Sequence, residues 1–237
     1  MELNKIYQGD CLEIMKQIDD KSVDMILTDI PYGEVNRQSN GLRNLDKGFA
    51  DIFNFSLEEM VQNFCRICRG SMYVFCGTEQ VSEIRSQMVK NGLSTRLVIW
   101  NKTNPSPMNG QYIWLSSIEC CVYGKFKNAT FNEHCKGSVL NFPCGRGKVH
   151  PTEKPIKLFE YIIGVSSNEN DTIIDPFAGS GTTGVACKNL NRNYILIEKE
   201  PAYIDIINKR LEEQNRKALL LKDGDDVADA LDKVYNL

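Results

Sequence analysis

Short apolar runs alternate with longer segments of helical periodicity, and this alternation constrains the fold more than any other feature. Buried strands are expected at residues 23–28, 71–76, 96–100, 118–123, 172–175 and 193–197. Helices are expected at residues 56–69, 81–90, 155–165, 182–190 and 201–216. Ser56 and Thr152 are candidate caps for two of them, and Gly70 is a candidate stop. Strands that alternate with helices predict an α/β fold with a largely parallel sheet.

Length and composition fit one globular domain that spans residues 1–237. Hydrophobic residues make up 42% of the chain and charged residues 25%, which is an ordinary balance for a packed core. No apolar run approaches the roughly 20 residues needed to cross a bilayer, and the first residues lack the apolar segment of a secretory signal. We therefore expect a cytoplasmic protein without membrane contact.

The charge is unevenly distributed around a net value of -3. Residues 96–154 contain eight Lys or Arg and three Asp or Glu, whereas residues 198–237 contain seven and ten. A basic central stretch can face phosphates, but on charge alone a solvated surface is the stronger interpretation.

The nine cysteines are an odd number in a chain expected to stay in a reducing compartment, so free thiols are expected. Cys65 and Cys68 have CxxC spacing but fall in an expected helix, where small apolar thiols fit a core. The other possible metal ligands have no regular spacing, and no metal site is expected. They are Cys120, Cys121, His134, Cys135, Cys144 and His150.

Residues 175–183 read Asp-Pro-Phe-Ala-Gly-Ser-Gly-Thr-Thr, directly after an apolar strand and before a helix. Glycines let the backbone approach a ligand closely, and a helix N-terminus offers free N–H groups. The segment is neither a GxGxxG motif nor a P-loop, because it lacks the third glycine and the lysine. The next strand is followed by Glu198, and an acid at that place in nucleotide-binding folds accepts ribose hydroxyls.

Residues 28–33 read Thr-Asp-Ile-Pro-Tyr-Gly and also end an apolar strand, where ligands bind in open α/β sheets. A carboxylate, backbone carbonyls and an aromatic ring lie within four residues. This set suits a planar ring that carries an amino group, since Asp29 can accept amino hydrogens while Tyr32 stacks on the ring. A strand that merely ends in a Pro-Tyr-Gly turn is an equally good interpretation of this segment alone.

Together these segments resemble the beta group of S-adenosylmethionine-dependent DNA amino-methyltransferases. Asp29-Ile30-Pro31-Tyr32 is similar to the family's (Asp/Asn/Ser)-Pro-Pro-Tyr motif, and residues 175–181 are similar to its cofactor loop. Residues 8–12 and 150–155 resemble two further elements, and the resemblance covers residues 6–215. The catalytic motif precedes the cofactor loop, which is the circularly permuted order of this group. The resemblance implies a Rossmann-like, mixed seven-stranded sheet with helices on both faces.

The resemblance also implies a catalytic site at Asp29, Ile30, Pro31 and Tyr32. Asp29 and the Ile30 carbonyl would hold the hydrogens of an exocyclic amine and direct its lone pair toward the methyl group, without a covalent intermediate. Tyr32 would stack on a base flipped out of the duplex, a role that needs its ring and not its hydroxyl. Ile30 replaces the family's first proline, which removes a φ restraint and restores an N–H. Asp rather than Ser at the first position favours adenine N6.

S-adenosylmethionine is the implied cofactor. The short element that includes Asp10 and Cys11 would bind its adenine, and Glu198 its ribose. The methionine end would be wrapped by the Gly-rich turn, with Lys154 and Thr182 near its carboxylate. Within that turn the implied contacts are Asp175, Phe177, Gly179 and Gly181.

Double-stranded DNA is the implied partner, and a homodimer is possible. A short target-recognition insert is expected at residues 125–149, where Arg146 and Lys148 would contact phosphate. The alternatives are a cytosine-N4 methyltransferase, an RNA-directed enzyme, a non-catalytic nucleic-acid binder and an NAD-dependent dehydrogenase. Pro143-Cys144 is similar to the nucleophile motif of cytosine-C5 methyltransferases, but it is expected in a loop away from the catalytic motif.

Overall fold

The structure is a computed structural model that describes residues 1–32, 56–107, 110–145 and 153–222. In these ranges eight strands form one sheet in the order β1-β8-β7-β2-β3-β5-β4-β6. They are β1 (Lys5–Gln8), β2 (Val23–Asp29), β3 (Cys68–Cys76), β4 (Ser94–Lys102), β5 (Ile118–Lys125), β6 (Val139–Phe142), β7 (Thr172–Asp175) and β8 (Asn193–Glu198). β5 runs antiparallel to both of its neighbours, and every other pairing is parallel.

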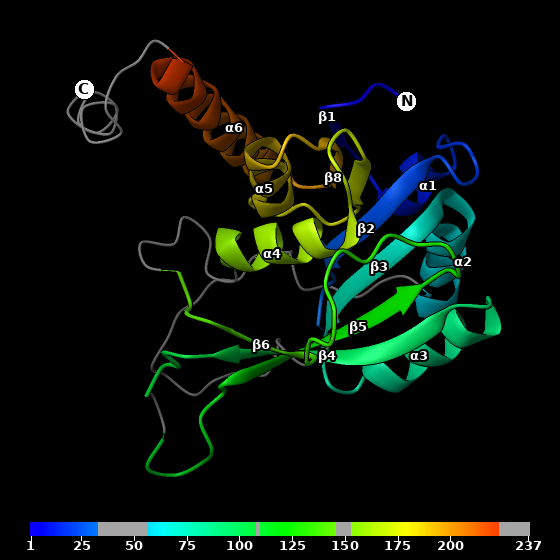
Figure 1. The fold of residues 1–237 in the computed structure, drawn as a ribbon, viewed down its shortest axis with the longest axis vertical. Helices are drawn as coiled ribbons and strands as arrows, with labels where there is room; N and C mark the ends of the chain where they lie inside the picture. The colour runs from blue at the N-terminus through cyan, green and yellow to red at the C-terminus, as the bar shows by residue number, and fades with distance from the viewer. Residues whose placement is uncertain (33–55, 108–109, 146–152, 223–237) are drawn as a thin grey trace.

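Helices cover both faces of the sheet, as the family resemblance implies (Figure 1). One face packs against α1 (Cys11–Met15), α2 (Leu57–Ile67) and α3 (Val81–Lys90). The other packs against α4 (Ile156–Ser166), α5 (Thr182–Asn189) and α6 (Pro201–Lys222). Two apolar cores separate the sheet from these layers, and their largest fully buried side chains include Phe64 on one face and Trp100 on the other. No helix within the described ranges combines the length and apolarity needed to cross a membrane.

The expected seven-stranded sheet is wrong by one strand, because the described residues form eight. β6 was not assigned from the sequence; it lies inside the insert expected at residues 125–149 and pairs in parallel with β4. β1 was also not assigned from the sequence. Both strands have four residues, and neither has a fully buried position, so their sequences carry little periodicity. They form because long-range partners supply their backbone hydrogen bonds.

Several element boundaries also differ from the sequence-based expectation. α2 is capped by Ser56 as expected, but it ends at Ile67 and passes directly into β3 at Cys68. Gly70 therefore lies inside a strand and not at a helix end. A Cβ there would lie 2.0 Å from the Asp24 carbonyl oxygen, so glycine permits the close approach of β3 to β2. The expected cap Thr152 lies outside the described residues, and Pro155 is the N-cap of α4.

Candidate active site

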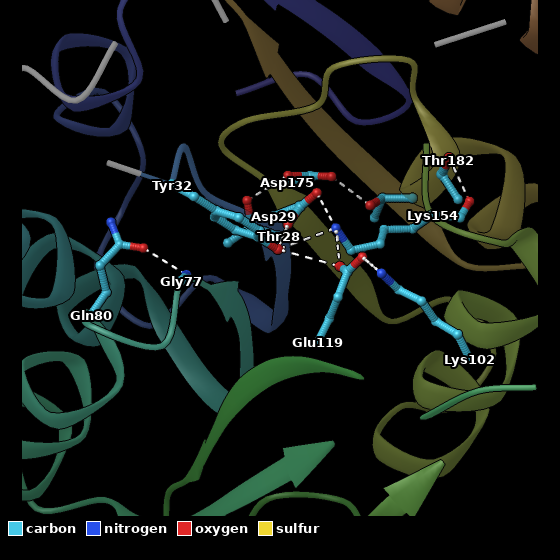
Figure 2. Close-up of polar contacts among 11 residues, drawn as sticks. Thr28, Asp29, Tyr32, Gly77, Gln80, Lys102, Glu119, Lys154, Asp175 and Thr182 are labelled. Atoms are coloured by element: carbon cyan, nitrogen blue, oxygen red, sulfur yellow. Dashed lines mark hydrogen bonds and ion pairs between the residues drawn. The ribbon is translucent and has the colours of Figure 1, made fainter. Parts of the chain in front are cut away.

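The two motifs singled out in the sequence lie side by side at the carboxyl edge of the sheet (Figure 2). β2 ends at Asp29 and β7 ends at Asp175, and the two strands are paired through Met25 with Ile173 and Ile26 with Ile174. The Thr28 hydroxyl donates a 2.7 Å hydrogen bond to Asp175. The sheet thereby joins chain segments that are 147 positions apart.

Both carboxylate oxygens of Asp29 have partners. The Tyr32 hydroxyl donates to Oδ1 over 2.6 Å, and the Lys154 ammonium binds Oδ2. Burial raises the pKa of the Asp29 carboxyl, Lys154 lowers it and Glu119 raises it, and the net shift is upward. The expectation that Tyr32 acts through its ring alone is therefore incomplete, because its hydroxyl orients the candidate catalytic carboxylate.

Lys154 lies at the centre of a buried chain of alternating charges. Its side chain is only 5% exposed and its ammonium contacts Asp29, Glu119 at 2.9 Å and the Tyr32 hydroxyl at 3.3 Å. Glu119 is in turn paired with Lys102 at 2.8 Å. Burial lowers the pKa of Lys154 and the two carboxylates raise it, with a net upward shift, so the ammonium stays charged. The Lys154 side chain thus reaches the candidate catalytic residues, and its carbonyl oxygen lies 3.5 Å from the Thr182 hydroxyl.

Glu119 is a site residue that the sequence analysis missed. It is the second residue of β5, and the β3–β5 pairing brings it to the carboxyl edge, because Cys120 lies opposite Cys76 at the end of β3. Burial raises the pKa of Glu119, but Lys154 and Lys102 lower it more, and the net shift is downward. A carboxylate in an otherwise apolar strand was the available signal, since such a group is rarely buried without a partner.

Ile30 and Pro31 hold the turn after β2 in place through backbone hydrogen bonds. The N–H that isoleucine restores donates to the Phe75 carbonyl over 3.1 Å, and the Ile30 side chain is buried in the core. The Pro31 carbonyl accepts from the Gln80 side-chain amide over 3.1 Å. The Gln80 side-chain oxygen in turn accepts from the Gly77 N–H (Figure 2). Hydrogen bonds thus hold this turn in place, whereas a proline at position 30 would do so by restricting φ.

The carboxylate of Asp175 is satisfied inside the Gly-rich turn. It accepts from the hydroxyls of Thr28 and Thr183 and from the N–H of Phe177. Burial raises the pKa of Asp175 to about 6, against the lowering effect of these hydrogen bonds. Asp175 therefore stabilises the shape of the turn from within.

Gly179 and Gly181 have the positive φ values of 51° and 79° that the turn requires. A Cβ on Gly181 would lie 2.8 Å from Ile207 of α6, so no larger residue fits there. A Cβ on Gly179 would meet no atom within 4 Å, so the turn borders open space at this point. Thr182 follows as the first residue of α5, whose N-terminal N–H groups lie at the same edge.

Glu198 and Asp10 complete this edge. Glu198 ends β8, and its carboxylate accepts from the N–H groups of Gly179 at 2.7 Å and Glu200 at 2.9 Å. Asp10 follows the neighbouring strand β1 and caps α1 by accepting from the Leu12 N–H, next to the buried Cys11. These residues fit the implied cofactor, because two carboxylates can accept ribose and amino hydrogens while the start of α5 offers donors for a carboxylate.

Three further expectations concern residues that lie away from the carboxyl edge of the sheet or outside the residues that the structure describes. Arg146 and Lys148 lie outside the described residues. Pro143-Cys144 lies in the loop after β6, and β6 is separated from β2 by three strands, which agrees with the expectation of a loop away from the catalytic motif. Cys65 and Cys68 are buried free thiols, and Cys68 opens β3 and is not helical. Within the described ranges no cluster of three His, Cys, Asp or Glu could hold a metal ion.

Comparison with known proteins identifies relatives over most of the chain. A family model described as DNA methylase matches residues 110–209. The type II methyltransferase M.HinfI of Haemophilus influenzae is 34% identical over 89% of this chain and 69% of its own length. The type II methyltransferase M2.MboI of Moraxella bovis is 30% identical over 88% of this chain and 87% of its own length.

Solved structures agree with these relatives. The complex of M1.HpyAVI with S-adenosylmethionine is 32% identical, with a TM-score of 0.68 over 87% of this chain and 98% of that chain. The cytosine-N4-specific PvuII DNA methyltransferase has a TM-score of 0.69 over 87% of this chain and 85% of that chain, but at 17% identity it shows the fold alone. This chain therefore belongs to the N6/N4 DNA methylase family and is an S-adenosylmethionine-dependent DNA methyltransferase.

Proposed function

We propose that the protein methylates the N6 amino group of adenine in double-stranded DNA, by direct transfer to a base flipped out of the duplex. The observation that carries this proposal is the position of Asp29 beside the Gly-rich turn, on adjacent strands that end at one edge. Asp at position 29, where some members of the family have Ser, supports adenine over cytosine as the target.

The reaction requires the protein mainly to orient the substrate amine toward the methyl group. An exocyclic amine donates its lone pair into the ring and is a poor nucleophile. Asp29 and the Ile30 carbonyl accept its two hydrogens, which localises the lone pair on nitrogen and directs it out of the ring plane. When bound, S-adenosylmethionine supplies an electrophilic methyl group on a sulfonium. The nitrogen gains the methyl group and loses one proton, and Asp29 is placed to accept that proton.

The buried charge network supports Asp29 in this role. In an apolar site a carboxyl group tends to stay protonated, and a protonated Asp29 would accept the amine hydrogen more weakly and could not take up the proton that the amine loses. Lys154 counters that tendency by lowering the pKa of Asp29. Glu119 shares the Lys154 ammonium, so that Asp29 does not neutralise the cation alone. The Tyr32 hydroxyl fixes the carboxylate while its ring remains available to stack on the target base.

The cofactor contacts follow the same edge of the sheet. We propose that Asp10 and the neighbouring Cys11 bind the adenine, that Glu198 binds the ribose, and that the turn with Gly179 and Thr182 holds the methionine end. The open space beside Gly179 supports this assignment. The protein would act in the cytoplasm on cellular DNA. Homodimerisation stays a prediction that sedimentation would test.

One experiment tests base and strand type together. Purified protein is incubated with S-adenosylmethionine and, in separate reactions, unmethylated duplex DNA, the same DNA as single strands, and RNA, and the digested nucleosides are analysed by mass spectrometry. We expect N6-methyladenine with double-stranded DNA, and no product with Asp29→Asn. N4-methylcytosine as the product would overturn the assignment of the base, and methylation of RNA in preference to DNA would overturn the assignment of the substrate.

A further inference from the structure

Four consecutive large apolar side chains are exposed in the connection between β4 and β5. Tyr112 is 82% exposed, Ile113 67%, Trp114 95% and Leu115 38%, and we refer to these four residues as the 112–115 tip. Scattered single apolar residues are normal on protein surfaces, but a contiguous group with two aromatic rings is typical of a contact surface.

The base of this connection is anchored to the candidate active site. The N–H of Lys102, at the end of β4, donates to the Ser117 carbonyl over 2.7 Å, and its ammonium lies 3.3 Å from the Ser116 carbonyl. The same ammonium pairs with Glu119, which contacts Lys154. The 112–115 tip is therefore attached, through residues that follow it immediately, to the charge network around Asp29.

Strand direction places the connection on the side of the sheet where Asp29 lies. β4 runs in the same direction as β2 and β3, and the antiparallel β5 begins where they end. In Figure 1 the connection, drawn in green at the lower left, projects beyond the ends of β4 and β5. A large, rigid substrate such as a DNA duplex would lie close to this connection when one of its bases reaches Asp29.

The composition of the connection favours nucleic-acid bases over a charged protein surface. Residues 103–117 contain no Asp, Glu, Lys or Arg, and the polar residues among them are Asn, Gln, Ser and Thr. No carboxylate is present to repel phosphates. Aromatic rings stack on bases, and amides and hydroxyls can bond to base edges.

We propose that the 112–115 tip contacts the DNA bases next to the target adenine, with Trp114 stacking on a base that loses its neighbour when the target is flipped. This inference rests on the proposed function, because it takes double-stranded DNA as the substrate. Flipping leaves an unstacked base in the duplex, and an aromatic ring at that position compensates for the lost stacking. Tyr112, two residues away, extends the same aromatic surface.

The two tryptophans of the chain allow a direct test. Trp100 is 1% exposed and Trp114 is 95% exposed, so acrylamide quenching of fluorescence reports mainly on Trp114. We expect a duplex that contains the target sequence to protect Trp114 from quenching by acrylamide. The comparison is made at a protein concentration at which Trp114 is fully quenched in the absence of DNA. Absence of protection at saturating DNA would overturn the proposal. Protection that rises with protein concentration without DNA would also overturn it, because the tip would then join two copies of the chain.

Variants give the second readout. Trp114→Ala should weaken binding to the target duplex about tenfold. It should also reduce base flipping, measured as the fluorescence of 2-aminopurine placed at the target position. Trp114→Phe should retain most of the affinity and most of the fluorescence. Val89→Ala, at a 52% exposed position on α3, is the matched control. Cofactor affinity measured by calorimetry should be unchanged in all three variants. Wild-type binding and flipping by Trp114→Ala would overturn the proposal, whereas failure of the proposed function would appear as absent DNA methylation in the wild-type protein itself.

Discussion

Lys154 and Asp29 form a buried ion pair in which the ammonium binds one carboxylate oxygen while the Tyr32 hydroxyl binds the other. The pair joins positions 125 residues apart, and the two side chains are 5% and 25% exposed. A buried ion pair is a poor source of net stability, because desolvation of both charges offsets their attraction. Its effect on the protonation of Asp29 is therefore the property that bears on catalysis.

Replacement of Lys154 by Met should move the pH dependence of methyl transfer to higher pH. The substitution removes the cation that lowers the pKa of Asp29, so the carboxyl ionises only at higher pH. We expect kcat at neutral pH to fall about tenfold or more, because less Asp29 is ionised, and to recover partly in alkaline buffer. Steady-state methylation across a range of pH measures both effects.

The control for this variant is Lys157→Met. Lys157 is 83% exposed and forms an ion pair with Glu160 on the surface of α4. It should keep the wild-type pH profile. If the acid limb of Lys154→Met coincides with that of the wild type, Lys154 does not set the protonation of Asp29.

Replacement of Glu119 by Gln should shift the profile in the opposite direction. Glu119 raises the pKa of Asp29, so removal of its charge lowers that pKa and the acid limb moves to lower pH. Lys154 then pairs with Asp29 alone and competes more strongly with the substrate amine, so kcat on the pH plateau should fall about three- to tenfold. A merely structural role of Glu119 would lower stability without this shift. Glu133→Gln, which alters an ion pair with Lys136, is the control.

Replacement of Tyr32 by Phe separates the ring from the hydroxyl. Loss of a hydrogen bond to an ionised carboxylate costs about 1.5–3 kcal/mol, so kcat should fall at least tenfold although the ring remains. Tyr32→Ala should be worse, because it also removes the stacking surface for the base. Full activity of Tyr32→Phe in single-turnover assays would show that Lys154 orients Asp29 without help from the hydroxyl.

The sequence predicted the two chemical segments because both follow a local rule. Asp29 and Asp175 each end an apolar run, and an α/β fold brings the ends of its parallel strands to one edge. The adjacency of β2 and β7 depends on pairings between residues 148 positions apart, Met25 with Ile173 and Ile26 with Ile174, which no local pattern encodes. Glu119 was missed for the same reason, since only the antiparallel β3–β5 register carries it to that edge. β1 and β6 were missed because edge strands need no continuous apolar face.

Replacement of Glu198 by Gln tests the cofactor half of the site. The Glu198 carboxylate accepts one N–H from Gly179 and another from Glu200, and it is proposed to accept a ribose hydroxyl as well. Glutamine keeps one acceptor oxygen, but its amide NH₂ must then face one of these two N–H groups. The turn at Gly179 or the segment at Glu200 loses its bond, and the ribose loses a charged partner.

We therefore expect Glu198→Gln to raise the Kd for S-adenosylmethionine about 10- to 100-fold, as for loss of a hydrogen bond to a charged group. The affinity for DNA should change less than twofold, since no DNA contact is assigned to Glu198. Calorimetry with cofactor and fluorescence anisotropy with labelled duplex measure the two affinities separately. Glu200→Gln is the control, because its backbone N–H, which bonds to Glu198, is retained. An unchanged cofactor Kd in a folded Glu198→Gln variant would restrict Glu198 to supporting the Gly179 turn.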